Sequence, residues 1–209
     1  MRTQAGTTLI GAIAPSWDMP AVLRNALLAV LGSLFVAASA QIQVPLWPVP
    51  ITGQTFAVLV VGMAYGSRLG AATLALYLAE GAVGLPVFAK WASGLSAVTG
   101  ATGGYLVGFI VAAAVVGWLA ERGWSRSATQ TAGAMVIGNL IIYALGLPWL
   151  ALFFAGPGAA YLASTGAATA LGAAIAKGLL PFLVGDAVKL ALAACLMPLA
   201  WKAVGLIRR

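Results

Sequence analysis

Histidine is absent from the 209-residue sequence, cysteine occurs once and acidic residues occur four times. With Cys195 alone, no disulfide can form within the chain. Without histidine, neither a Cys/His metal site nor histidine-based acid–base catalysis is available. The acidic residues are Asp18, Glu80, Glu121 and Asp186. Few side chains are therefore available for acid–base catalysis, and no cofactor is expected.

Charge is also scarce: charged residues make up 7% of the chain, whereas 62% is hydrophobic and the mean hydropathy is +1.03. A soluble domain of this size does not bury so large an apolar fraction, so the expected solvent is a lipid bilayer. The net charge is +7. Because the basic residues stand singly at the ends of apolar runs rather than on one face, nucleic-acid binding is not expected.

Six apolar segments predict an all-α polytopic membrane protein, a bundle of six transmembrane helices forming one domain over residues 1–209. The segments cover residues 22–40, 53–65, 69–83, 102–120, 129–147 and 171–207, and the outer connections are 41–52, 84–101 and 148–170. The second and third segments are short, since about 15 residues rise ~22 Å against a hydrocarbon core of ~30 Å. They either span the membrane with their ends buried or form a re-entrant hairpin.

The distribution of lysine and arginine predicts that the N- and C-termini are both cytoplasmic. With that orientation, most basic residues lie at cytoplasmic helix ends, as the positive-inside rule requires: Arg2, Arg24, Arg68, Arg122, Arg126, Lys202, Arg208 and Arg209. The other three, Lys90, Lys177 and Lys189, fall in the outer half. An ordinary topology signal does not explain them.

The last segment contains "GDAVKLALAACLMP", in which Asp186 and Lys189 are three residues apart and share a helix face. If Lys202 marks the inner boundary, Asp186 lies ~24 Å up the helix, within the outer part of the membrane. Ionisable groups at that depth need partners and commonly mark functional sites. The pair either forms the base of an outward-facing cavity or only neutralises itself inside the bundle.

A second polar constellation runs from Leu78 to Phe109, where Glu80 and Lys90 bracket a Gly-Leu-Pro turn. Phe88 and Trp91 flank Lys90, which suits a small amphipathic ligand with an anionic end. An interfacial lysine beside a tryptophan belt explains the same residues equally well. Tyr105, near the start of the fourth helix, is either a hydrogen-bond donor in the cavity wall or an aromatic-belt residue.

Two further features lie in the first 56 residues. The stretch "QIQVPLWPVPITGQTF" carries three prolines, so it cannot be a regular helix, and we predict a stiff lid with Trp47 facing a ligand and Thr52 and Gln54 close by. The first helix carries a small-residue stripe, Ala29, Ser33 and Ala37, at four-residue spacing. Such a stripe serves either a partner protein or packing within the chain.

Four motifs, "QVPLWPVPITGQTFAVLVVG", "YLAEGAVGLPVFA", "GATGGYLVGF" and "GDAVK", occur in the order and spacing of the BioY family, which this sequence resembles. That family comprises the biotin-binding S components of energy-coupling-factor (ECF) transporters. The resemblance implies a protein of the prokaryotic cytoplasmic membrane that binds biotin from outside. It implies docking of the small-residue stripe on a transmembrane coupling protein driven by ABC-type ATPases, and ring binding by Asp186 and Lys189. Where the family often has Asn, this chain has Lys90.

Biotin's chemistry suits these residues. Asp186 can accept a hydrogen bond from a ureido N–H, and Lys189 can donate one to the ureido oxygen. In this pose Lys90 can pair with the valerate carboxylate. The opposite pose, with the valerate on Lys189, stays open. The candidates to line the ring and chain are Trp47, Phe56, Phe88, Trp91 and Tyr105. The competing hypotheses are an S component for another vitamin, a structural membrane partner and an intramembrane enzyme. Homo-oligomerisation is left open. The chain has no Walker phosphate loop, so ATP hydrolysis is expected from other chains.

Overall fold

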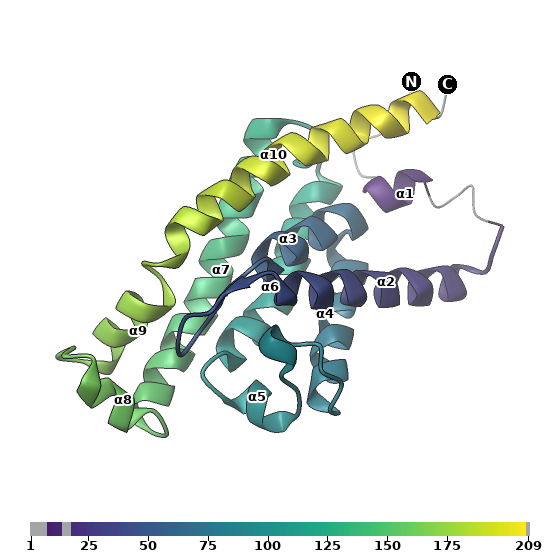
Figure 1. The fold of residues 1–209 in the computed structure, drawn as a ribbon. Helices are drawn as coiled ribbons and strands as arrows, with labels where there is room; N and C mark the ends of the chain where they lie inside the picture. The colour runs from purple at the N-terminus through teal and green to yellow at the C-terminus, as the bar shows by residue number, and fades with distance from the viewer. Residues whose placement is uncertain (1–7, 14–17, 208–209) are drawn as a thin grey trace.

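The computed structural model describes residues 8–13 and 18–207, and within them the chain is helical apart from one short two-stranded hairpin (Figure 1). The elements are α1 (Leu9–Ile13), α2 (Ala21–Gln41), β1 (Gln43–Val44), β2 (Ile51–Thr52), α3 (Gln54–Tyr65), α4 (Ser67–Ala82), η2 (Ala89–Trp91), α5 (Leu95–Thr99), α6 (Gly103–Glu121), α7 (Ala128–Ala155), α8 (Ala159–Ser164), α9 (Ala170–Gly178) and α10 (Phe182–Ile207).

Helix α6 forms the centre of the bundle and packs against α3, α4 and α7 (Figure 1). Glycines on α6 allow α7 to approach closely. A Cβ added to Gly104 would lie 2.6 Å from the carbonyl oxygen of Leu145, and one added to Gly108 would lie 3.1 Å from the Cα of Ile142. Because glycine alone avoids these close contacts, the two positions fix the spacing of the two helices that carry much of the site.

The short helices α3 and α4 are joined at Gly66, whose φ of 87° favours glycine. Glu121, at the end of α6, caps the start of α4 by accepting hydrogen bonds from the backbone N–H and the hydroxyl of Ser67, both at 2.8 Å. A carboxylate at a helix N-terminus is also favoured by the helix dipole. The turn between α3 and α4 is therefore tied firmly to the central helix.

Helix α2 crosses the other helices at a steep angle, and its N-terminal half extends beyond them (Figure 1). Its buried face packs against α3 and α4. Its opposite face is apolar and exposed, as at Leu23 and Leu34, which are 58% and 55% exposed. An exposed apolar face of this kind requires lipid or a partner protein to cover it.

Four helices are long and apolar enough to cross a membrane: Ala21–Gln41, Gly103–Glu121, Ala128–Ala155 and Phe182–Gly205. Helices α3 and α4 have 12 and 16 residues and are shorter than a standard span. The ends of α2, α3, α4 and α6 lie within two residues of the segments expected at 22–40, 53–65, 69–83 and 102–120.

Two expected boundaries were wrong. The outer loop expected at 148–170 begins only after Ala155, because α7 continues through Pro148, and α8 occupies part of the remainder. A proline is tolerated inside a membrane helix where neighbouring helices compensate for the lost hydrogen bond. The helix expected at 171–207 is instead two helices, α9 and α10, interrupted at residues 179–181. Gly178 is the last residue before this break and Pro181 is the last residue within it, and both residues disfavour a continuous helix.

The two other outer connections contain ordered structure. The expected loop 41–52 forms an antiparallel hairpin in which Gln43 pairs with Thr52 and Val44 with Ile51. The expected loop 84–101 contains η2 and α5. Both segments lie at the end of the molecule opposite α1 and the end of α10 (Figure 1).

Candidate ligand-binding site

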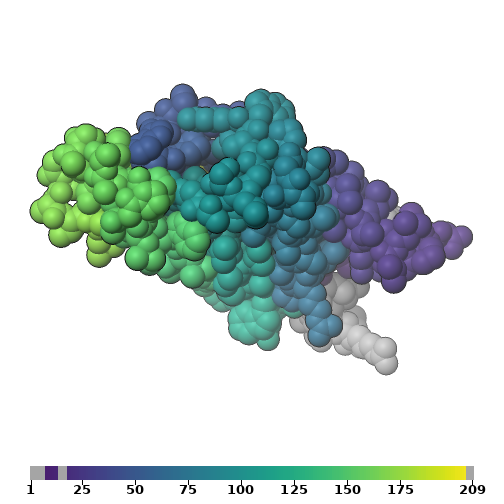
Figure 2. Space-filling view, turned by 90° about the horizontal axis from the view of Figure 1, so that it is seen from below, coloured from purple at the N-terminus to yellow at the C-terminus, as the bar shows by residue number. Residues whose placement is uncertain are grey.

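A cavity of about 310 Å³ opens where the hairpin, the 84–102 segment and the first turns of α3, α6 and α10 meet. In Figure 2 the hairpin segment (blue), the 84–102 segment (teal) and α8 (green) lie beside one another on this face. The volume is at the lower end of the range for small-molecule sites. Seven of the predicted site residues line the cavity: Trp47, Thr52, Gln54, Phe88, Lys90, Tyr105 and Lys189.

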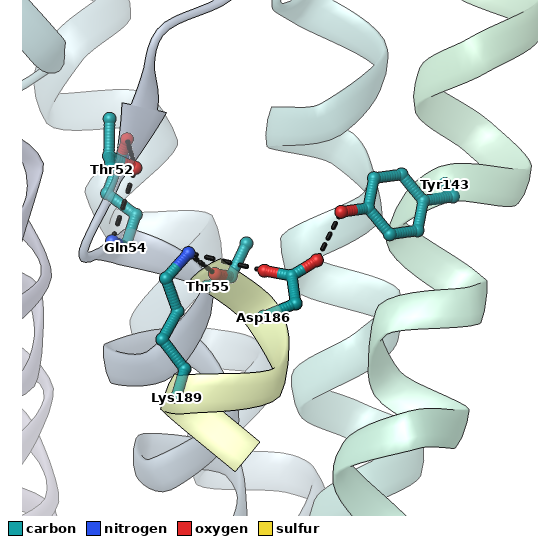
Figure 3. Close-up of polar contacts among 6 residues, drawn as sticks. All are labelled: Thr52, Gln54, Thr55, Tyr143, Asp186 and Lys189. Carbon is teal, nitrogen blue, oxygen red and sulfur yellow. Dashed lines mark hydrogen bonds and ion pairs between the residues drawn. The ribbon is translucent and has the colours of Figure 1, made fainter. Parts of the chain in front are cut away.

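The base of the cavity is a hydrogen-bonded network that joins α3, α7 and α10 (Figure 3). The Lys189 ammonium donates to Thr55 Oγ1 at 2.8 Å and to Asp186 Oδ1 at 3.2 Å. The hydroxyl of Tyr143 donates to the other carboxylate oxygen, Oδ2. Because an ammonium has three donors, Lys189 keeps one N–H for a ligand acceptor.

The structure places Asp186 just behind the residues that line the cavity, and its direct contact with the ligand stays a prediction. Its side chain is buried, it does not line the cavity, and each carboxylate oxygen already accepts a hydrogen bond from the protein. The two residues that hold it, Lys189 and Tyr143, do line the cavity. Asp186 therefore fixes the positions of the ammonium and the phenol that border the cavity.

Thr52 and Gln54 form a second polar cluster on the cavity wall (Figure 3). The Gln54 amide donates to the hydroxyl of Tyr77 at 2.7 Å and accepts from the hydroxyl of Thr52 at 3.1 Å. Tyr77 in turn donates to the carbonyl oxygen of Val87 at 3.0 Å. This chain of bonds connects the start of α3 with the loop that carries Phe88.

Tyr105 lines the cavity with its ring, not with a free hydroxyl. Its O–H donates to the carbonyl oxygen of Gly178 at 3.0 Å, and the side chain is buried. The Tyr105 hydroxyl, expected as a donor to the ligand, is thus already bonded to a carbonyl in the last turn of α9. Carbonyls in that position have no hydrogen-bond partner within their own helix. Tyr105 contributes shape and apolar surface to the site.

Lys90 and Trp91 lie at the mouth in an unusual backbone conformation, with φ values of 59° and 58°. Non-glycine residues rarely adopt such angles, and a pair of them commonly marks a functional segment. Lys90 lines the cavity, and its ammonium forms no hydrogen bond or ion pair with the described residues. Trp91 does not line the cavity and is 68% exposed, so the structure does not bring it together with the other predicted site residues.

The hairpin covers one side of the mouth. The ring of Trp47 packs against that of Tyr161 in α8, with centroids 3.9 Å apart, and Tyr161 donates a hydrogen bond of 3.4 Å to the Trp47 carbonyl. The loop between β1 and β2 also lines the cavity, with Trp47, Pro48, Val49 and Pro50. The expected lid is therefore attached to α8 in this conformation.

The small-residue stripe on α2 faces the chain's own bundle. Ser33 is fully buried, and its hydroxyl lies 3.0 Å from the Glu80 carboxylate on α4; Ala29 and Ala37 are half-buried. This geometry supports packing within the chain. Ala29 and Ala37 keep part of their surface accessible, and docking of the stripe on a partner protein stays a prediction.

The comparisons with known proteins agree with the motifs. The model of the BioY family matches residues 8–206, nearly the whole chain. The chain belongs to the BioY family. The resemblance first drawn from the four sequence motifs is therefore confirmed.

Relatives from distant organisms match most of this BioY chain. A "Probable biotin transporter BioY" from Pyrococcus horikoshii is 37% identical over 166 residues, 78% of this chain and 89% of the relative. A "Biotin transporter BioY" from Thermotoga maritima is 36% identical over 172 residues, 82% of this chain and 92% of the relative.

The fold is also that of a solved protein, the S-component for biotin from an ECF-type ABC transporter, whose crystal structure was determined at 2.1 Å. The TM-score is 0.68, and the match covers 88% of this chain and 95% of the solved one. At 19% identity, the match establishes a shared fold.

Sequence reasoning missed Tyr143, which in this BioY chain belongs to the base of the cavity. The available signal was weak: it is the one ionisable side chain in the apolar run from Thr131 to Leu147. Its partner Asp186 lies 43 residues later, so no local spacing links the two.

Proposed function

We propose that this chain is the membrane-embedded, substrate-binding component of a biotin uptake system and not an enzyme. Membership of the BioY family and the names of its relatives support this role. The cavity supplies a place for the ligand at the end of the molecule where the outer connections meet.

The observation that carries the proposal is the network at the base of the cavity. The remaining N–H of Lys189 suits the ureido oxygen, a strong acceptor, and the aromatic walls from Phe88, Tyr105 and Trp47 suit the apolar ring and chain. Lys90 at the mouth suits the valerate carboxylate. The opposite pose would place the carboxylate on Lys189.

In the proposed membrane arrangement, α2, α3, α4, α6, α7 and α10 form the six-helix bundle of a single domain. Both ends of the chain are cytoplasmic, and the cavity opens outward. Basic side chains near the opposite end support this orientation: Arg24 and Arg68 border one cavity there, and Arg122 and Arg126 stack on Trp118 and Trp201. The membrane would be the prokaryotic cytoplasmic membrane.

This sequence carries no phosphate-binding loop for ATP, so any ATP hydrolysis that drives uptake is expected from other chains. The proposed partners are an ECF transmembrane coupling protein and ABC-type ATPases. The solved protein with the same fold, an S-component of an ECF-type ABC transporter, supports this assignment. The exposed apolar face of α2 faces lipid or that coupling protein.

The test is titration of the purified protein with biotin, followed by tryptophan fluorescence. Trp47 borders the cavity, so binding is expected to change its emission, and Trp47→Phe should reduce the change. Riboflavin and thiamin serve as control ligands. Saturable binding of either control, with no response to biotin, would identify an S component for another vitamin and overturn the proposal.

A further inference from the structure

A second cavity, of about 630 Å³, lies at the other end of α6 from the ligand cavity. Tyr105, near the start of α6, borders the ligand cavity, whereas Trp118 and Glu121, in its last turn, border this one. Tyr105 and Glu121 are about 24 Å apart along the helix. The second cavity is therefore a separate place, and its volume is within the range of small-molecule sites.

The lining of this second cavity carries more positive than negative charge. Arg24 on α2 and Arg68 on α4 both border it, and Glu121 is the one acid among the described residues that line it. The Glu121 carboxylate is already engaged, because its Oε1 accepts two hydrogen bonds from the start of α4. Arg122 stacks on the ring of Trp118, 3.4 Å from the ring centre, and adds a third positive charge at the rim. The balance of charge favours an anionic ligand.

Several hydrogen-bond donors in the second cavity are available to such an anion. The guanidinium of Arg68 and the hydroxyl of Tyr65 form no hydrogen bond or ion pair with the described residues. The side chain of Asn25, which is exposed, adds an amide. A guanidinium donates two parallel N–H bonds to two oxygens of a phosphate or a carboxylate. The chemistry of the lining therefore suits a phosphate group surrounded by polar substituents.

An apolar surface adjoins this polar lining on α2. Leu27, Leu31 and Leu34 follow Arg24 at helical spacing, so the three leucines and the arginine lie on one side of the helix. The leucines are 43%, 50% and 55% exposed. A small soluble anion would leave this leucine stripe uncovered, whereas a lipid would cover it with its acyl chains. Trp118, at the rim and 46% exposed, is of a type enriched where membrane meets water.

We propose that the second cavity binds the phosphate head group of an anionic phospholipid, with its acyl chains along the leucine stripe of α2. Basic pockets between membrane helices recognise such head groups by their charge and donors. The assignment to the cytoplasmic leaflet rests on the orientation proposed above, whereas lipid binding itself rests only on the chain's lying in a membrane.

The bound lipid joins two helices through their arginines. Arg24 belongs to the N-terminal half of α2, which extends beyond the other helices, and Arg68 belongs to the first turn of α4 (Figure 1). One phosphate between the two guanidinium groups holds this half of α2 beside the turn between α3 and α4. The lipid is thus a structural ligand, at a distance from the vitamin site.

Native mass spectrometry in detergent measures the lipid directly, with phosphatidylglycerol as the probe and phosphatidylcholine of the same acyl chains for comparison. We expect one saturable site that prefers phosphatidylglycerol. Each arginine near an anionic head group contributes about five-fold in affinity, so Arg24→Gln combined with Arg68→Gln should weaken binding about 30-fold. Arg126→Gln combined with Lys202→Gln is the matched control, because it removes the same charge outside the cavity and should leave the affinity unchanged. Equal losses in the two double variants would overturn the proposal.

The source of the phosphate is tested with the soluble head group, glycerophosphoglycerol. It lacks acyl chains and should bind far more weakly than the lipid. Equal affinity for the two would refute a lipid site and identify one for a soluble anion. Equal affinity for phosphatidylcholine and phosphatidylglycerol would refute recognition of the anionic charge.

A milder pair of variants covers the case in which the double arginine variant does not fold. Asn25 is exposed and borders the cavity, so Asn25→Lys should strengthen phosphatidylglycerol binding and Asn25→Glu should weaken it, each by about five-fold. Changes in the same direction would contradict the proposal. Biotin titration of the same samples is a separate readout, because neither Asn25 nor the two arginines line the ligand cavity. Absence of biotin binding would overturn the proposed function without affecting the lipid measurement.

Discussion

Replacement of Lys189 by methionine should separate the two tasks of that residue. Methionine keeps an unbranched side chain of similar length but removes the ammonium, its bonds to Thr55 and Asp186, and the N–H that faces the cavity. We expect both lower stability and weaker biotin binding. The two losses have different causes and can be measured separately.

The stability loss follows from the burial of the pair. The side chains of Lys189 and Asp186 are 14% and 8% exposed, so the variant leaves a carboxylate in a largely dry site with Tyr143 as its remaining donor. Removing one partner of a buried ion pair typically costs about 3–5 kcal/mol. The residual exposure and the Tyr143 bond place the expected loss near the lower end, about 3 kcal/mol.

The binding loss follows from one hydrogen bond. A bond between an ammonium and an uncharged acceptor contributes about 1.5–3 kcal/mol, which corresponds to a roughly 10- to 150-fold weaker affinity. Fluorescence titration with biotin measures this change, and thermal unfolding in detergent measures the stability. Lys177→Met is the matched control, because Lys177 is exposed on α9 and does not line the cavity.

A double variant tests the reasoning further. Asp186→Leu combined with Lys189→Met removes the stranded carboxylate, so the double variant should be more stable than Lys189→Met alone while binding stays weak. Wild-type affinity in folded Lys189→Met would refute the direct contact between Lys189 and the ligand. A double variant less stable than the single one would refute the ion-pair explanation.

Three further changes test other parts of the site. Tyr143→Phe removes the donor to Asp186 and should lower stability by about 1–3 kcal/mol in thermal unfolding; an unchanged unfolding temperature would contradict the role of that bond. Lys90→Gln should weaken biotin binding by up to about five-fold without affecting biotin amide, and equal losses for both ligands would exclude a Lys90–carboxylate contact. Gly104→Ala should cost about 1–3 kcal/mol by overpacking against α7, whereas Gly205→Ala, where an added Cβ meets nothing within 4 Å, should cost nothing.

The sequence was most informative for helices that are bounded by polar or glycine-rich residues. The ends of α2, α3, α4 and α6 follow from such signals, and each lies within two residues of expectation. Proline was misleading in α7: Pro148 predicts the end of a helix, but the helix continues to Ala155. The opposite error affected Gly178 and Pro181, which interrupt a helix expected to be continuous. In both cases tertiary packing decides what the local signal leaves open.

For the site, local spacing identified Asp186 and Lys189 because the two residues share one helix. It could not show that Tyr143 on α7 and Thr55 on α3 complete the network, since those contacts span 43 and 134 residues. For the same reason the sequence could not show that Asp186 lies behind the cavity lining, with each of its oxygens bonded to a side chain that borders the cavity. A sequence indicates which polar groups need partners, but the fold decides which partners they find.

The distribution of charge along the cavity favours one ligand pose. At the base, Lys189 and Asp186 form a salt bridge of 3.2 Å, so the pair has no net charge. At the mouth, Lys90 has no ion-pair partner among the described residues and contributes one positive charge. A neutral but polar ring matches the base, where it can accept a hydrogen bond without adding a charge to a buried pair. A single carboxylate matches the mouth. There the carboxylate and the Lys90 ammonium both stay in contact with water, so pairing them carries little desolvation cost. Biotin is therefore expected to enter ring first, with its valerate beside Lys90.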